Sequence, residues 1–160
     1  MAFDAFLKID GIDGESTDKT HPNEIQIDSF SWGVSNPSTI GSAGGGGGAG
    51  KSSLQDFQFT AALCKASPNL MLACAVGQHL RTATLTCRKA GGAGQVEFLK
   101  IKLSDCLVTS YSVGGSAGDI APQPEDEFSL LFAKIDFLYT VARTGEVVEA
   151  AFDQLGGTGG

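Results

Sequence analysis

Residues 128–139 read Phe-Ser-Leu-Leu-Phe-Ala-Lys-Ile-Asp-Phe-Leu-Tyr, and this stretch decides the fold class. Its apolar positions keep a period of two on either side of Ala133–Lys134 but change phase there, from Phe128, Leu130 and Phe132 to Ile135, Phe137 and Tyr139. Alternation of this kind predicts a half-buried strand. The change of phase predicts a bulge or bend, as expected where a strand turns the corner of a barrel.

The same alternation recurs along the chain on the N-terminal side of this stretch. It covers about residues 3–9, 24–32, 56–60, 82–88 and 96–113, and the last of these is interrupted near Ser104–Asp105. Runs of turn formers such as Asp10–Gly14 separate the segments. The pattern predicts a mainly β chain of roughly seven strands. A length of 160 residues fits one domain.

One short helix is predicted at about residues 68–77. Pro68 suits its first position, Ser67 is a candidate N-cap, and Gly77 provides a left-handed stop. The seven residues of Leu70–Val76 are all apolar, so this helix has no polar face of its own. Either neighbouring subunits bury it or it plugs one mouth of its own barrel, and the sequence favours neither arrangement.

The composition points to covered surfaces and away from nucleic acid. Charged residues make up 18% of the chain, against about 25% in typical proteins, which suggests that partners cover part of the surface. The formal net charge is −7 and the isoelectric point is about 4.6. A surface of that sign releases no counterions from a polyanion, so nucleic-acid binding is not expected.

Cysteine spacing and the N-terminus bear on metal binding and export. Cys64, Cys74, Cys87 and Cys106 form no C-x-x-C pair, so a zinc site is not expected. The first residues lack a basic segment followed by a long apolar run, and no stretch approaches 18 apolar residues. We therefore expect synthesis in the cytoplasm with reduced thiols, no membrane insertion, and any export to bypass the general secretory route.

A glycine tract at residues 41–50 produces an apparent nucleotide-binding motif. Residues 45–52 read Gly-Gly-Gly-Gly-Ala-Gly-Lys-Ser and match the phosphate-binding pattern G-x-x-x-x-G-K-[ST]. That mechanism needs a buried strand before the loop and a helix after it. Polar residues precede the tract and a predicted strand follows it, so we interpret the tract as a connection between strands that orders on assembly. No cofactor is expected.

The remaining polar motifs do not combine into a catalytic site. The acidic residues of segment 10–18 miss the spacing of a calcium loop and are interpreted as a solvated turn. His21 and His79 lie in no nucleophile context and are interpreted as structural or incidental. Trp32 is interpreted as a core residue. The sequence therefore predicts a protein that is not an enzyme and that holds no metal.

Several segments, in order, resemble the Hcp family, the tube-forming haemolysin-coregulated proteins of bacterial type VI secretion. The resemblance spans about residues 2–141 and is carried by these segments: 4–11 (Asp-Ala-Phe-Leu-Lys-Ile-Asp-Gly), 30–33 (Phe-Ser-Trp-Gly), 55–60 (Gln-Asp-Phe-Gln-Phe-Thr), 67–71 (Ser-Pro-Asn-Leu-Met), 88–92 (Arg-Lys-Ala-Gly-Gly) and 107–112 (Leu-Val-Thr-Ser-Tyr-Ser). Residues 142–160 match the family only loosely.

The resemblance implies a β-barrel of two packed antiparallel sheets with one helix, closing into hexameric rings. Such rings stack into a tube that a contractile sheath propels from the cell with spike and effector proteins, some effectors lying in the lumen. The expected contact loop lies within about residues 35–51, at Gly44, Gly45, Gly46, Gly47, Gly48 and Lys51. The expected subunit-interface helix carries Pro68, Leu70, Met71, Leu72 and Val76, and Ser116 is a candidate cargo contact in the lumen.

Two other functions remain open from the sequence. A monomeric β-barrel that binds a small ligand would share the strand pattern. A phage-type tail tube subunit would share the assembly as well, because the resemblance implies a related design.

Overall fold

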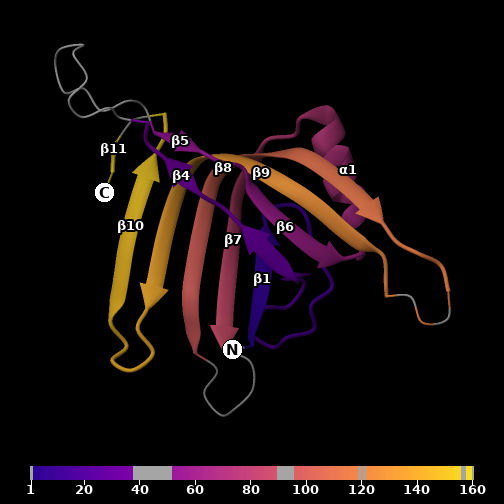
Figure 1. The fold of residues 1–160 in the computed structure, drawn as a ribbon, viewed down its shortest axis with the longest axis horizontal. Coiled ribbons are helices and arrows are strands. Elements are labelled where there is room, and N and C mark those ends of the chain that lie inside the picture. Colours follow the sequence, from indigo (N-terminus) through magenta and orange to yellow (C-terminus); the bar gives the residue numbers. More distant parts are fainter. Residues whose placement is uncertain are drawn as a thin grey trace.

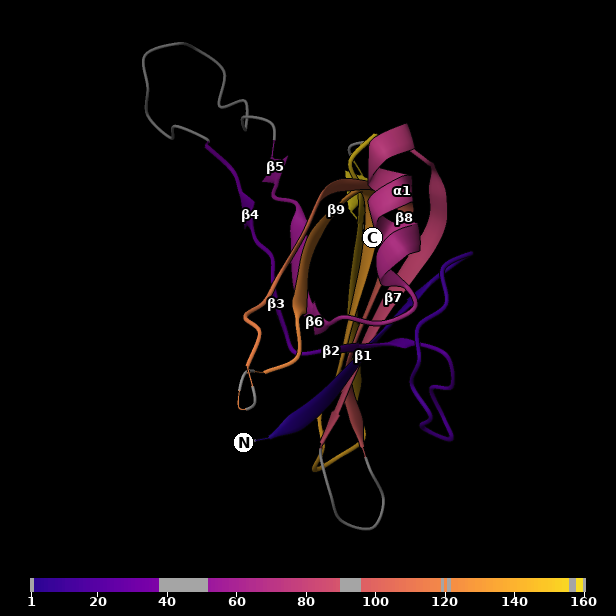
Figure 2. The same ribbon diagram turned by 90° about the vertical axis from the view of Figure 1, so that its right-hand side faces the viewer.

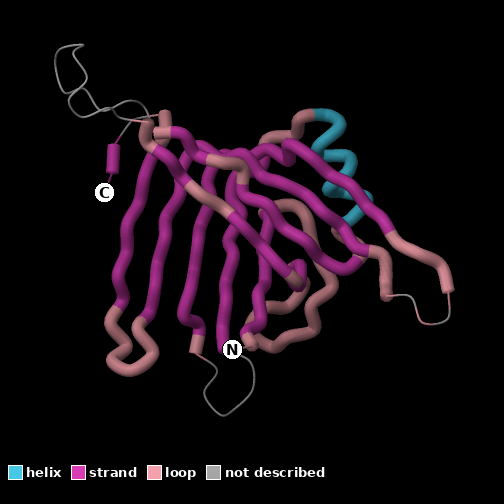
Figure 3. Tube along the Cα trace, in the orientation of Figure 1, coloured by secondary structure: helices cyan, strands magenta, loops and turns pink. Residues whose placement is uncertain are grey.

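The structure is a computed structural model that describes residues 2–37, 52–89, 96–118, 120, 122–155 and 158–159. Within these residues the chain forms one helix and eleven strands (Figures 1 and 3). In chain order they are β1 (Phe3–Ile9), β2 (Ile25–Ile27), β3 (Ser29–Ser31), β4 (Val34–Ser35), β5 (Ser53–Leu54), β6 (Phe57–Ala62), α1 (Ser67–Val76), β7 (Leu80–Lys89), β8 (Glu97–Gly114), β9 (Glu125–Thr140), β10 (Val147–Asp153) and β11 (Thr158–Gly159).

The barrel closes through strands that change partners along their length. Neighbouring strands follow the order β11-β10-β9-β8-β7-β1-β2, while β6 pairs with both β9 and β3. β2 and β3 are separated by Asp28 alone, whose backbone N–H donates to Thr60 O at 2.8 Å. The ring of strands β1, β2/β3, β6, β9, β8 and β7 is thereby nearly closed (Figure 2). The predicted mainly β barrel with one helix is confirmed, and its two sheets are two layers of one hydrogen-bonded sheet.

The corner predicted near Ala133–Lys134 is where β9 passes from one layer to the other. Before it, β9 pairs with β6 as far as Leu130; after it, β9 pairs with β10 from Lys134 onward. Phe132 and Ile135 are both buried on either side of the bend. Asp105 of β8, which lies opposite, has a φ of 55°. The change of phase in the sequence therefore marks the change of layer.

The interior of the barrel is filled by side chains. Phe57, Phe59 and Phe128 are each 1% exposed, and their rings stack in series with centroids 4.8 and 5.2 Å apart. Trp32, interpreted as core, packs against Phe57 at 6.1 Å and Phe132 at 6.2 Å. Interdigitated rings of this kind leave a small barrel with a packed core.

The helix α1 packs against the barrel at β8. Gly77 ends it in the left-handed conformation (φ 64°), and its N–H and the next one donate to carbonyls of the last turn. The N-cap position is occupied by Ala66 without a side-chain hydrogen bond, so the prediction that Ser67 caps the helix is wrong. The Ser67 hydroxyl instead donates to the carboxylate of Asp126.

The C-terminal segment extends the sheet. β10 pairs with β9 from Val147↔Thr140 to Asp153↔Lys134, although residues 142–160 resemble the family only loosely. Among the described residues, no helix is both long and apolar enough to cross a membrane.

Candidate functional site

Within the part of the chain that the structure describes, two apolar surfaces are left uncovered, and the first is the outer face of α1. Ser67, Leu70 and Ala73 point into the barrel and are at most 2% exposed. The opposite face carries Met71, Leu72 and Val76, which are 51%, 53% and 65% exposed. The helix therefore plugs its own barrel with one face and presents apolar side chains to the outside with the other.

A buried carboxylate holds the start of α1 in place. Asp126 of β9 is 0% exposed and accepts hydrogen bonds from the Ser67 hydroxyl and, at 2.6 Å, from the Tyr111 hydroxyl. Burial, together with the bond to Asp126, raises the pKa of Tyr111 to about 12. The phenol thus stays a donor at physiological pH, and the orientation of α1 is tied to β8 and β9.

The second apolar surface is the core face of the sheet where it continues past the barrel. On this face, residues paired across β7, β8, β9 and β10 form three rows of side chains. In each row the side chains become more exposed toward β10. The clearest row starts at Cys87 (0% exposed), passes through half-buried Leu99, and ends at Tyr139 (45%) and Val148 (54%). The rows continue the core pattern, but the second layer covers them only in part: the Trp32 ring reaches Phe137, with centroids 6.4 Å apart, while Tyr139 and Val148 stay about half exposed.

The reverse face of the same strands is charged. It surrounds a shallow hollow of about 540 Å³ lined by Lys8, Glu24, Thr84, Thr86, Lys100, Lys102, Asp136, Leu138 and Glu149. Because successive side chains of a strand point to opposite faces, the alternation separates a charged surface from an apolar one.

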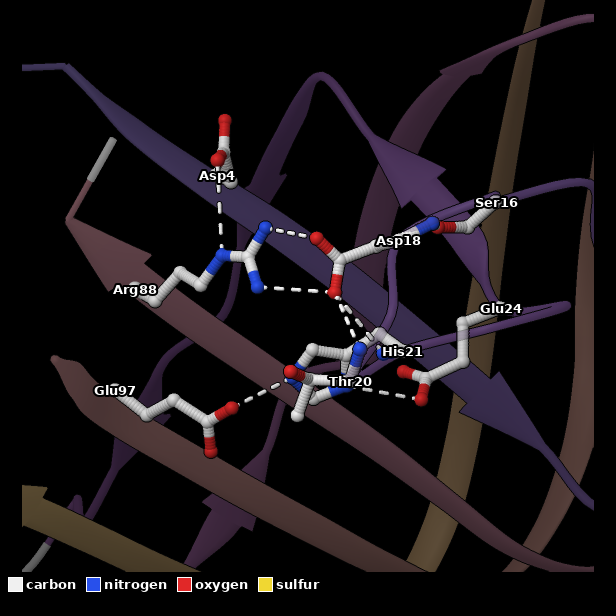
Figure 4. Close-up of polar contacts among 8 residues, drawn as sticks. All are labelled: Asp4, Ser16, Asp18, Thr20, His21, Glu24, Arg88 and Glu97. Carbon is white, nitrogen blue, oxygen red and sulfur yellow. Dashed lines mark hydrogen bonds and ion pairs between the residues drawn. The ribbon is translucent and has the colours of Figure 1, made fainter. Parts of the chain in front are cut away.

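The loop between β1 and β2 is fastened to the sheet by an ion pair (Figure 4). Arg88 of β7 donates from both terminal nitrogens to the carboxylate of Asp18, and its Nε lies 3.7 Å from Asp4. The hydrogen bond from Arg88 lowers the pKa of Asp18 far below its usual value. Arg88 also lies over the ring of Phe6, with its Cζ 4.9 Å from the centroid.

His21 fastens the same loop to the start of β8. Its Nδ1 lies 2.9 Å from Glu24, its Nε2 lies 2.6 Å from Glu97, and its ring stacks on Phe6 at 4.8 Å. Burial alone would lower the pKa of His21, but hydrogen bonds to Glu97 and Glu24 raise it above its ordinary value. The imidazolium form therefore bridges two carboxylates.

These contacts revise one interpretation of the loop and bear out another. Segment 10–18 was expected to be a solvated acidic turn, yet its Asp18 is paired with Arg88. His21 is structural, in line with its interpretation, but nothing in the sequence points to its partner Glu97, because the two lie 76 positions apart. All four cysteines are free thiols. No cluster of His, Cys, Asp and Glu that could hold a metal ion occurs among the described residues.

The predicted contact residues divide into three groups. The loop residues Gly44, Gly45, Gly46, Gly47, Gly48 and Lys51 lie outside the described residues. Pro68, Met71, Leu72 and Val76 are exposed on α1, whereas Leu70 is 0% exposed. The prediction that Leu70 lies at the subunit interface is corrected, because its side chain is buried in the core of its own subunit. Ser116 is exposed in the turn between β8 and β9.

The helix and the outermost strands of this packed barrel expose uncharged apolar faces. Such faces are typical of the class of subunits that assemble with other protein surfaces. The family model described as "Type VI secretion system effector, Hcp" matches residues 6–139. The chain therefore belongs to the Hcp family, and it is a subunit of the type VI secretion tube. Hexameric rings that stack are known for this family.

Similar proteins support this assignment in sequence and in structure. Protein hcp1 of Pseudomonas aeruginosa is 48% identical over 139 residues, which make up 87% of this chain and 84% of that protein. The crystal structure of Hcp1 from Salmonella typhimurium is similar with a TM-score of 0.80 and 36% identity, covering 99% of both chains. A type VI secretion system effector from Yersinia pestis is similar with a TM-score of 0.75 and 35% identity, covering 94% of this chain and 99% of that one.

Proposed function

We propose that this chain closes into homohexameric rings, joined head to tail, which stack into the exported tube. The observation that carries the proposal is the apolar outer face of α1, where Met71, Leu72 and Val76 are each more than half exposed. Exposed apolar patches of this kind mark protein contacts. In a closed ring each subunit must offer two different surfaces, and α1 is the first of them.

The role proposed for the chain is structural, with no catalysis and no cofactor. The barrel interior is occupied by stacked phenylalanines such as Phe57, Phe59 and Phe128, which supports a building block over a barrel that binds a small ligand. Cytoplasmic synthesis, followed by export without a signal peptide, fits the family's description as a secretion effector. The family context favours type VI secretion over a phage-type tail tube.

The remaining contacts follow from where the loops begin and end. β4 and β5 pair through Val34↔Leu54 and Ser35↔Ser53, so they bring together the two ends of the segment that holds the glycine tract. This stem supports a role for Gly44–Gly48 and Lys51 in contacts between rings. Ser116, exposed at the β8–β9 turn, is proposed as a cargo contact at the rim of the lumen. Sheath, spike and effector proteins are the partners that the family implies.

The solution mass of the untagged protein tests ring formation. Light scattering across a range of concentrations is expected to give a mass near six times 16.5 kDa. Leu72→Glu places a charge on the exposed face of α1 and is expected to lower the mass toward one subunit, with the circular dichroism of a β protein unchanged. A wild-type protein that stays monomeric at high concentration would contradict the proposal.

A further inference from the structure

We propose that the outer face of α1 packs onto the uncovered core face of β8, β9 and β10 in the next copy of this chain. The proposal rests on the ring inferred above, which requires two different complementary patches, and it identifies the second patch. We call this second surface the open sheet face and define it by Leu99, Phe137, Tyr139, Val148 and Ala150.

The open sheet face is a piece of hydrophobic core that lacks its cover. In one row, Leu85 and Ile101 are 1% and 2% exposed, but their registered continuation Phe137 is 38% exposed and Ala150 is exposed. In the next row, exposure rises from Cys87 to Val148 in the same way. Apart from the Tyr139 hydroxyl, the side chains along these rows are apolar from β7 to β10. The loss of burial comes from the end of the second layer, so the cover must come from outside the described part of the subunit.

Within its own subunit, α1 covers one side of the barrel with apolar side chains. The open sheet face lacks such a cover. Its inner residues Leu70 and Ala73 are 0% exposed against the barrel. Its outer residues are also apolar, and the sequence Ser-Pro-Asn-Leu-Met-Leu-Ala-Cys-Ala-Val contains no charged side chain. A helix that is apolar on all sides is normally buried on all sides. We infer that it sits between two barrels, plugging its own and covering the other.

The two patches lie at opposite sides of the subunit, as head-to-tail assembly requires. In Figure 1, α1 stands at the upper right of the barrel, and β10 lies at the left with the two-residue strand β11 beside it. In Figure 2, where the right-hand side of Figure 1 faces the viewer, α1 stands in front, beside β7 and β8 in the upper part of the view. A second copy placed on the right would bring its β10 side toward the α1 of the first.

Charge explains why these two patches should meet each other. Each subunit carries a net charge of −7, so copies repel one another and their contact should be free of charge at its centre. None of the five residues that define the open sheet face is charged. The reverse face of the same strands, by contrast, carries Lys100, Lys102, Asp136 and Glu149 and would have to be desolvated on contact. Of the two faces of this sheet, the open sheet face therefore suits α1.

The two patches are too small to form the whole contact, and their apolar character suits its centre. A stable interface buries about 800 Å² on each partner. Three half-exposed helical side chains and a few half-exposed sheet residues supply only part of that area. The fully buried centre is the most apolar part of an interface. Strand edges and loops would then form the polar rim.

The test exchanges charges between the two patches. Leu72→Glu and Val148→Lys are each expected to convert the ring to monomers in light scattering. Val147→Lys is the matched control, because Val147 is 55% exposed against 54% for Val148 on the same strand but points to the opposite face. It is expected to leave the ring mass unchanged.

Recovery of the ring identifies the pairing. The double variant L72E/V148K places a glutamate of one copy against a lysine of the next at every contact, and it is expected to restore the ring mass. An equimolar mixture of the two single variants is expected to form rings as well, because alternating copies meet as Glu–Lys and as wild-type pairs.

The outcomes separate this inference from the ring itself. A wild-type protein that is monomeric would overturn both. A wild-type ring that survives Val148→Lys, or that is lost equally with Val147→Lys, would overturn the open sheet face as the partner surface and leave the ring standing. Loss in both single variants without recovery in the double variant or the mixture would overturn the direct pairing with α1.

Discussion

At the scale of single residues, one aromatic ring organises the loop between β1 and β2. Phe6 is 3% exposed and carries His21 stacked on it and Arg88 over it. Both cationic groups are anchored to acids, Arg88 to Asp18 and His21 to Glu97. Cations over an aromatic face are favoured by its quadrupole. The loop is therefore attached to β1, β7 and β8 through side chains.

The contacts of His21 predict a dependence of stability on pH. Because its pKa is raised in the folded state, the stabilisation is fully present below the unfolded value of about 6.5 and is lost as the pH rises through the folded value. His21→Gln is expected to lower the stability by about 2 kcal/mol at pH 6, a magnitude typical of hydrogen bonds to charged groups. The loss should shrink toward pH 9.5. Thermal unfolding of both proteins at equal concentration measures it.

His79→Gln is the control for that series. His79 pairs with Asp105 at 3.0 Å, but both side chains are about 60% exposed, and exposed ion pairs contribute little. Its unfolding temperature is expected to follow the wild type at every pH. An equal loss for His21→Gln at pH 6 and pH 9.5 would mean that His21 is neutral in the folded protein.

Two buried charged side chains, Arg88 and Asp126, could not be placed from the sequence. Period-two alternation places Arg88 and Asp4 on strands, but nothing local indicates that Arg88 meets Asp18, 70 positions away. The same holds for Asp126, which reads as one of three consecutive acids (Glu125–Glu127) and is the fully buried one. Pairings of this kind depend on which strands become neighbours, and that is decided by the whole sheet.

At the scale of elements, the helix and the bent strand were predictable because their signals are local. The proline at position 68, the apolar run and Gly77 bound α1 correctly, and the change of phase at Ala133–Lys134 located the corner of β9. The sequence left open whether α1 faces its own barrel or a neighbour. The two faces differ in burial but not in composition, so only the three-dimensional structure separates Leu70 from Leu72.

Gly77 gives a prediction that belongs to the helix as a unit. Its φ is 64°, and a Cβ built there would meet nothing within 4 Å. A substitution therefore adds backbone strain without a clash. Gly77→Ala is expected to cost about 1 kcal/mol in the free energy of unfolding, measured in urea.

Gly114→Ala is the matched control for the strain at Gly77. Gly114 ends β8 without a positive φ, and a Cβ there would also meet open space. It is expected to leave the stability unchanged or slightly higher. If both alanine variants lose the same amount, the left-handed conformation of Gly77 does not determine how α1 ends.

At the scale of the whole molecule, the barrel presents different chemistry to each side. The core face of the outer strands is apolar and open, the reverse face is charged, and α1 closes the side opposite β10. A single free subunit would leave apolar surface in water at both sides. Repeating the contact around a ring covers both apolar surfaces with one kind of interface, as a closed heterologous assembly does.

Contacts between rings should be separable from contacts within a ring, and the glycine tract allows the test. In Figure 2 the stem formed by β4 and β5 lies on the opposite side of the molecule from α1. Deleting Gly44–Gly48 is therefore expected to preserve the ring mass in light scattering and to shorten the stacks seen by negative-stain electron microscopy at high protein concentration. Fixing the backbone costs roughly 1–2 kcal/mol per residue, so contacts that the tract makes on stacking must offset that cost. Replacing the same five glycines by serines keeps the length and separates the effect of reach from that of sequence. Stacks of unchanged length in the deletion variant would remove the tract from the ring-to-ring contact, whereas loss of the rings themselves would move it into the interface between neighbouring subunits.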